Sequence, residues 1–163
     1  QEAASLLKTN EDKVVTRIES LLTQLKDLER ENESLQAKLS NQETAELLNK
    51  VKNHAGIQVL AEKVNVKDMN QLRNMIDYLK QKIETGVILL AAENKGKVLL
   101  ISGVSNDLIE RNIHAGKLIG EAAKICGGGG GGRPDMAQAG GKDTSKIDDA
   151  LASVYTYVEK NLK

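Results

Sequence analysis

The sequence lacks several residue types on which common functional sites depend. It has one cysteine, which excludes an internal disulfide and any zinc site built from several cysteines. Aromatic residues make up 2%, with no Trp and no Phe, so stacking of nucleobases on aromatic side chains is disfavoured. The only histidines, His54 and His114, leave little material for a metal site or a catalytic triad. No run approaches about 18 consecutive apolar residues and no signal peptide is recognisable, so we expect no membrane span.

An excess of one charge is also missing. The 23 Lys and Arg residues equal the 23 Asp and Glu residues, and this balance argues against a general binder of polyanions. Any contact with nucleic acid must therefore come from a local patch. Apolar residues make up 40%, which is enough for a core. Because the chain begins with Gln1 inside a helical pattern, we expect a piece of a longer polypeptide whose catalytic centre lies elsewhere.

The first part of the chain carries a heptad pattern. Residues 1 to about 48 contain no Gly and no Pro, and apolar residues recur at alternating steps of three and four. A helix of this length, roughly 70 Å, needs a partner helix to cover its apolar seam. We therefore predict that residues 1–52 form a helical coiled-coil arm for dimerisation. Its seam comprises Val14, Ile18, Leu21, Leu25, Leu28, Asn32, Leu35 and Leu39.

Two questions about this arm stay open. Asn32 at a core position of the heptad is a known device for fixing register and favouring two strands. The flanking charged positions do not choose between parallel and antiparallel pairing. Packing of the arm on other parts of a longer chain is the alternative to self-association.

Residues 55–163 are typical of a globular α/β domain. An alternating stretch at 57–62 predicts a strand, and Asp68 with Gln71 predicts the start of a helix that ends before a left-handed Gly86. The apolar run 87–92 predicts a buried strand, which pairs with 98–102 as a hairpin.

Two more helices are expected, one from 107 to 125 and one starting near Ser145. The first crossover predicts a parallel pair of strands. We therefore expect an α+β or α/β fold with a mixed, mostly buried sheet flanked by helices, and at most one further strand before the last helix.

The region between the last two helices is the most informative. Six consecutive glycines, Gly127 to Gly132, predict either a flexible linker or a loop whose backbone approaches an anion closely. Arg133 follows with a forked donor suited to phosphate. Neither the Walker loop nor the dinucleotide-binding fingerprint fits, because no strand precedes the run. A local positive patch is formed by Arg111, Lys117, Lys124 and Arg133, against Glu121 alone.

The string GGGGRPDMAQAGG at 129–141 resembles the signature of the C-terminal domain of bacterial alanyl-tRNA synthetases. The similarity extends to the helical start, to 86–92, to 97–103 and to 115–119. The globular part is also similar to the nucleic-acid-binding module attached to DHH-type phosphoesterases. Those modules carry a His where Arg133 stands, and the Asp-His-His motif is missing here, so a phosphoesterase is disfavoured.

The resemblance implies a function that composition does not reveal. It implies a non-catalytic domain that binds the outer corner of tRNA-Ala, helps bring the aminoacylation and editing centres onto one tRNA, and contributes to dimerisation. It implies a cytoplasmic protein whose partners are tRNA-Ala, a second copy, and the aminoacylation and editing domains of the same chain. ATP, magnesium and the editing zinc would belong to the parent enzyme, with no cofactor or metal in this chain. The alternative is a structural dimerisation module with incidental RNA contact.

The resemblance also implies which residues face the RNA. They are Gly127, Gly128, Gly129, Gly130, Gly131, Gly132, Arg133, Asp135, Gln138, Gly140 and Gly141. Asp135 has a rival role, that of holding Arg133 in place, and Gln138 is as well suited to stabilising the loop. Further candidates for phosphate contacts, against ordinary solvated charge, are Lys142, Lys117, Lys124 and Arg111.

Overall fold

The computed structural model describes residues 1–163 and divides into two compact units, Gln1–Ser40 and Asn41–Lys163. The division falls before the boundary near residues 52–55 that the sequence suggests. The reason is that Thr44 and Leu47, in the last turns of helix α2 (Val14–Leu47), are buried in the second unit. No helix is long and apolar enough to cross a membrane.

The first unit does not form one helix from its first residue. Helix α1 (Glu2–Leu6) is followed by a turn in which Lys8 has φ 49°, and a 3-10 turn η1 (Glu11–Lys13) then leads into α2. The long helix starts at Val14, where the regular heptads begin. Within this unit Val14 and Leu21 are half-buried. The remaining apolar seam residues are exposed, namely Ile18, Leu25, Leu28, Leu35 and Leu39.

The second unit is built on a six-stranded sheet of order β1-β2-β3-β4-β6-β5. After η2 (Leu48–Lys50), its strands are β1 (Lys52–His54), β2 (Ile57–Lys63), β3 (Gly86–Asn94), β4 (Lys97–Val104), β5 (Gly129–Gly132) and β6 (Met136–Gly141). The β2–β3 pair is parallel and the other pairs are antiparallel. The predicted mixed sheet, parallel crossover and hairpin are confirmed. Two strands, β5 and β6, lie between the last two α-helices, where at most one was expected.

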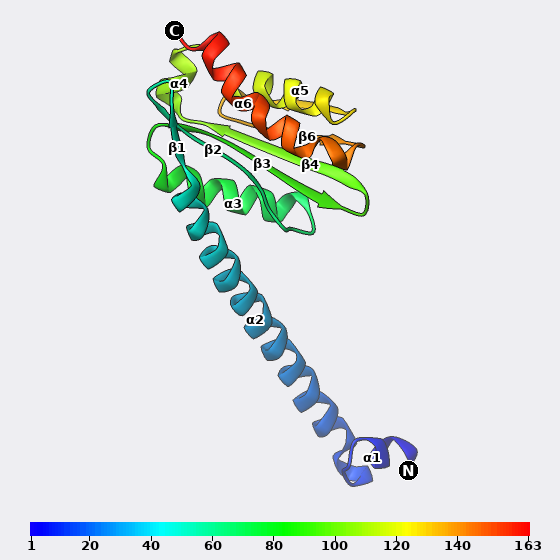
Figure 1. The fold of residues 1–163 in the computed structure, drawn as a ribbon. Coiled ribbons are helices and arrows are strands. Elements are labelled where there is room, and N and C mark those ends of the chain that lie inside the picture. Colours follow the sequence, from blue (N-terminus) through cyan, green and yellow to red (C-terminus); the bar gives the residue numbers. More distant parts are fainter. The chain divides into compact units, whose positions relative to one another are not determined.

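Helices cover both faces of this sheet, as Figure 1 shows. Helix α3 (Met69–Lys82) lies on one face, and α5 (Ala115–Ile125) and α6 (Ile147–Asn161) lie on the other. Along β3, Val87, Leu89 and Ala91 pack beneath α5 and α6. The alternate residues Ile88, Leu90 and Ala92 pack beneath α3. Burial on both sides explains why this strand is a continuous apolar run.

The start of α3 agrees with the sequence, and its end does not. The Asp68 side chain accepts a hydrogen bond from Gln71 N at 2.9 Å, and the Gln71 side chain accepts one from Lys67 N at 2.8 Å. The helix ends at an extended Ile83, so the prediction that Gly86 caps it is wrong. Gly86 instead begins β3, where a Cβ would lie 2.6 Å from Ile83 Cγ2 and 2.9 Å from Gln58 O. Close packing of β3 against β2 explains this glycine.

The helix predicted at 107–125 is two helices. Helix α4 (Asn106–Glu110) ends before Asn112, which has φ 70°, and α5 begins after His114. The buried Tyr157 hydroxyl accepts a hydrogen bond from His114 N at 3.1 Å and donates one to His114 O at 3.3 Å. Burial raises the pKa of Tyr157. A side chain 43 residues away thus stabilises the break, which the local helical periodicity could not reveal.

Candidate nucleic-acid interface

The glycine run is not a loop for most of its length. Gly127, with φ 66°, terminates α5. The Gly127 N–H donates a hydrogen bond to Lys124 O, and the Gly128 N–H donates one to Ala123 O. This pair of hydrogen bonds is typical of a helix that ends at a left-handed residue. Gly129–Gly132 then form β5, the outer strand of the sheet, paired with β6. The predictions of a flexible linker and of a loop over 127–132 are therefore wrong. The run is a helix end followed by an edge strand.

Successive glycines of β5 have different surroundings. At Gly130 a Cβ would overlap Ala139, and at Gly132 it would lie 2.8 Å from Ala137 Cα. A Cβ at Gly128 would overlap Gly140 O in the same way. At Gly129 and Gly131, however, nothing lies within 4 Å of the place that a Cβ would take. Packing within the chain therefore explains why Gly128, Gly130 and Gly132 are glycines. It does not explain why Gly129 and Gly131 are glycines.

These two glycines belong to one open face. Gly131 pairs with Gln138 and Gly129 pairs with Gly140 across the β5–β6 ladder. On β6 the alternate residues Ala137 and Ala139 are in the core beneath α5 and α6, so this face is on the α3 side. The core beneath α3 takes its buried sheet residues from β2, β3 and β4, has Met136 of β6 packed against it, and includes no residue of β5. We give the name glycine platform to this set, which comprises the exposed Gly129, Gly131 and Gln138 and the half-buried Gly140.

Cations of α3 and of the β5–β6 turn border this platform. Arg73 donates from Nε and Nη2 to the Gln138 Oε1 at 2.9 and 2.6 Å. Lys80, two helical turns further along α3, donates to Asp135 O at 3.2 Å. The sequence gives no sign of a role for Arg73 and Lys80, because their spacing on a helix does not show that α3 lies beside β6.

Asp135 holds two of these cations. Its carboxylate lies 3.2 Å from Arg133 Nε and 3.8 Å from Lys80 Nζ, while its carbonyl accepts a hydrogen bond from Val104 N at 3.0 Å. The Arg133 side chain is 74% exposed and the Asp135 side chain 32%. The geometry matches the rival role considered for Asp135, which fixes the direction of Arg133.

The structure does not gather the other predicted cations around the platform. Lys124 lines a shallow groove with Asp149 and Thr156 of α6, on the opposite side of the sheet. Lys117, two turns earlier, lies exposed on the same helix. Arg111 donates to the carbonyl of Lys163, at the end of the chain. The single positive patch inferred from the sequence is therefore wrong as a spatial cluster.

The end of β6 is packed against the end of α5. Gly141 is buried, and a Cβ there would lie 2.5 Å from the Cys126 Cβ. The N–H groups of Lys142 and Asp143 both donate to Cys126 O, at 2.8 and 3.0 Å, which ties β6 to the end of α5. The Lys142 side chain is exposed. Burial raises the pKa of the Cys126 thiol.

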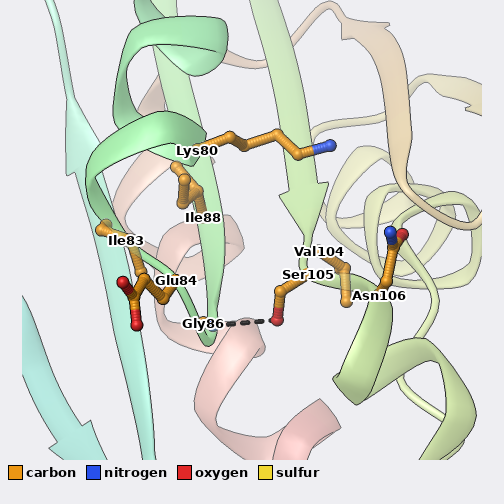
Figure 2. A pocket seen from close by; sticks show the side chains of 8 residues that line it. All are labelled: Lys80, Ile83, Glu84, Gly86, Ile88, Val104, Ser105 and Asn106. Atoms are coloured by element: carbon orange, nitrogen blue, oxygen red, sulfur yellow. Dashed lines mark hydrogen bonds between the residues drawn. The ribbon is translucent and has the colours of Figure 1, made fainter.

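A pocket of about 200 Å³ lies at the end of the sheet where β3 begins and β4 ends (Figure 2). Lys80 and Glu84 both line it and point apart, and Gly86 N donates to Ser105 Oγ at 3.0 Å. The pocket thus offers one ammonium group, already bonded to Asp135, beside mostly neutral groups. No group of three or more His, Cys, Asp or Glu side chains that could hold a metal ion occurs in the structure.

A mixed sheet with a glycine edge strand, covered by α3 on one face and α5 and α6 on the other, defines the class of domain. Residues 56–160 match the family model described as the DHHA1 domain, and the chain belongs to that family. Within it, the chain corresponds to the C-terminal region of alanine–tRNA ligases, as the resemblance of the sequence indicated.

The relatives are similar over nearly the whole chain. It is 58% identical to the alanine–tRNA ligase of Oceanobacillus iheyensis over 99% of its length, and 54% identical to that of Bacillus subtilis over 99%. It spans only 18% of the length of each of these relatives. The structure is similar to the C-Ala domain of Aquifex aeolicus alanyl-tRNA synthetase, with a TM-score of 0.61, 29% identity, and coverage of 66% of this chain and 96% of that one.

Proposed function

We propose that this chain is a tRNA-binding domain of an alanine–tRNA ligase, and that the glycine platform docks on the outer corner of tRNA-Ala. The observation that carries the proposal is the open space at Gly129 and Gly131, which no contact within the chain requires. A strand without side chains on its exposed face lets another surface approach its backbone closely. The relatives are alanine–tRNA ligases, which supports tRNA as that surface.

The chemistry around the platform suits a folded RNA. The chain has no Trp and no Phe to stack on bases, so shape and phosphate contacts must dominate. Arg73, Lys80 and Arg133 supply positive charge at the border of the platform, although the whole chain is neutral. A few local cations predict binding that weakens with salt, with a slope that reflects a few phosphates.

In the longer enzyme, such a domain would hold one tRNA for two centres. Aminoacylation, with ATP and magnesium, and editing, with zinc, would take place outside this chain. The domain would keep the tRNA bound while its acceptor end moves between those centres. Its contribution is therefore binding and positioning.

We further propose that the arm pairs with the arm of a second copy. Five apolar seam residues, Ile18, Leu25, Leu28, Leu35 and Leu39, are each at least 43% exposed. Their heptad spacing is that of a coiled-coil seam, and Asn32 would set the register of two strands. The same exposed seam supports the alternative function, a structural dimerisation module for which contact with RNA is incidental.

Titration of the whole chain with tRNA-Ala tests the main proposal. The wild-type chain should bind tRNA-Ala more tightly than an unrelated RNA hairpin, at low and at moderate salt. A double variant, Gly129→Val with Gly131→Val, should lose this binding because two side chains then stand on the platform. Lys160→Ala, which removes an exposed charge from α6, is the matched control and should bind normally. Equal affinity for tRNA-Ala and the hairpin would contradict the proposal.

Sedimentation equilibrium tests the arm. Leu28→Glu places a charge in the seam and should convert a dimer into a monomer. Ala37→Glu places the same charge on the outer face of the same helix and should leave the dimer intact. If Leu28→Glu abolishes dimerisation while tRNA-Ala still binds, the two roles belong to different parts of the chain. A wild-type monomer at high concentration would contradict the pairing of arms.

A further inference from the structure

We propose that Arg73 and Gln138 together form a site for one phosphate of the RNA backbone, in which Arg73 also orients the Gln138 amide. Neither the sequence motif nor the comparisons assign a role to Arg73. The inference rests on the proposed function and deepens it, since it names the chemical group that meets one border of the glycine platform.

The hydrogen bonds between the two side chains determine how the amide is oriented. Two guanidinium nitrogens of Arg73, Nε and Nη2, donate to the same Gln138 oxygen at 2.9 and 2.6 Å. A guanidinium has only donors, so the atom that faces it must be the amide oxygen and not the amide nitrogen. The Gln138 NH2 group therefore points away from Arg73, and it has no hydrogen-bond partner within the chain. Arg73 makes Gln138 a pure donor toward any ligand.

The charge of Arg73 is not compensated. Its partners are the side-chain oxygens of Gln138 and, at 3.4 Å, of Asn70, which are both neutral. Lys80 and Arg133, the other cations at the platform border, share the carboxylate of Asp135. A full positive charge with free N–H donors thus remains at the Arg73 end, whereas the opposite end is partly neutralised. An anion is expected at Arg73.

The neighbouring backbone leaves room for that anion. Gln138 is paired across the ladder with Gly131, the platform glycine with nothing within 4 Å of a Cβ. A phosphate can therefore reach the Gln138 NH2 group and the outer N–H groups of Arg73 without meeting a side chain on β5. A phosphate matches a set of donors that carries positive charge, because it is an anion with acceptors only. The N7 and O6 edge of a guanine also presents only acceptors, but it is neutral and would leave the charge of Arg73 uncompensated.

The decisive variant is Gln138→Glu. A glutamate keeps an oxygen for Arg73 and turns the hydrogen bond into an ion pair, so the thermal midpoint should be unchanged or higher. It also replaces the free NH2 group by a negative charge. Affinity for tRNA-Ala should therefore fall by about tenfold or more, since a hydrogen bond to a charged group is lost and repulsion is added. A merely structural pair would be unaffected or strengthened by this change.

Salt dependence distinguishes a phosphate from a base edge. Arg73→Met keeps the apolar stem and removes the charge, so the slope of log affinity against log salt should become shallower by about one. Gln138→Met removes the donors without adding charge and should weaken binding less than Gln138→Glu does. Lys160→Ala is again the control, with unchanged affinity and slope.

These experiments distinguish failure of the phosphate site from failure of the proposed function. If the wild-type chain binds tRNA-Ala and the double valine variant does not, but Gln138→Glu binds like wild type, the phosphate site is overturned and the platform stands. An unchanged salt slope in Arg73→Met, with weaker discrimination between RNA sequences, would overturn the phosphate in favour of a base edge. Absence of tRNA binding by the wild-type chain would overturn both proposals.

Discussion

Adding one methyl group to neighbouring glycines of β5 should have opposite effects on stability. In Gly130→Ala the new Cβ would overlap Ala139 Cα and Cβ and lie 2.5 Å from Gln138 O. Each of these atoms belongs to the backbone or, like Ala139 Cβ, is attached directly to the backbone. Strand β5 must therefore shift away from β6. In Gly131→Ala the methyl group enters open space. It also lowers the conformational freedom of the unfolded chain.

The magnitudes follow from these surroundings. Overpacking of a tight site costs about 1–3 kcal/mol, so Gly130→Ala should lower the free energy of unfolding by that amount. Gly131→Ala should raise it by about 0.4–1 kcal/mol. For a domain of this size, 1 kcal/mol shifts the thermal midpoint by roughly 4 °C. We therefore expect a fall of about 4–12 °C for the first variant and a rise of about 2–4 °C for the second.

Differential scanning calorimetry measures both midpoints, and titration with tRNA-Ala adds a second measurement on the same samples. Gly131→Ala should bind tRNA-Ala more weakly although it is more stable, because its methyl group stands on the platform. A single substitution that raises stability and lowers affinity cannot be explained by damage to the fold. Equal midpoints for the two variants would refute the alternation of packed and open glycines. A more stable Gly131→Ala with unchanged affinity would refute the platform as the contact surface.

Three further outcomes are expected. Lys117→Ala and Lys124→Ala should each leave tRNA-Ala affinity within about twofold of wild type, since α5 lies on the face opposite the platform; a tenfold loss in a filter-binding assay would show that RNA reaches that face. Tyr157→Phe removes the acceptor for the His114 N–H and should cost about 1–3 kcal/mol in urea unfolding, and a neutral result would mean that the break before α5 needs no such support. The Cys126 thiol is buried with a raised pKa, so a thiol reagent at pH 7 should modify it only after unfolding, and rapid labelling of the folded chain would contradict its burial.

Part of the candidate site could be predicted from the sequence because its motif is contiguous. Gly129, Gly131, Gln138 and Gly140 all belong to one short string, and they do share a face. Their neighbours Gly128, Gly130 and Gly132 carry equal weight in the sequence, although they serve packing against β6. The string alone could not separate the two sets, because alternation becomes meaningful only once a strand and its partner are known.

Arg73 and Lys80 could not be predicted for a different reason. Arg73 meets Gln138 across 65 residues of sequence, and Lys80 meets Asp135 across 55. Both contacts depend on the crossover that places α3 over the sheet beside β6. By contrast, Lys117 and Lys124 are close to the glycine run in sequence, and α5 carries them to the other face. Proximity in sequence was misleading for these cations.

The sequence by itself determined the features that short-range physics controls: the heptad pattern of the long helix, the cap at Asp68, and the buried run that became β3. Each depends on a few neighbouring residues and on the periodicity of apolar side chains. Only the tertiary structure decided that the glycines form an edge strand, that the chain turns at Asn112, and that Arg73 borders the platform. Those features depend on which distant surfaces pack together, because burial and strand pairing are set by partners far along the chain.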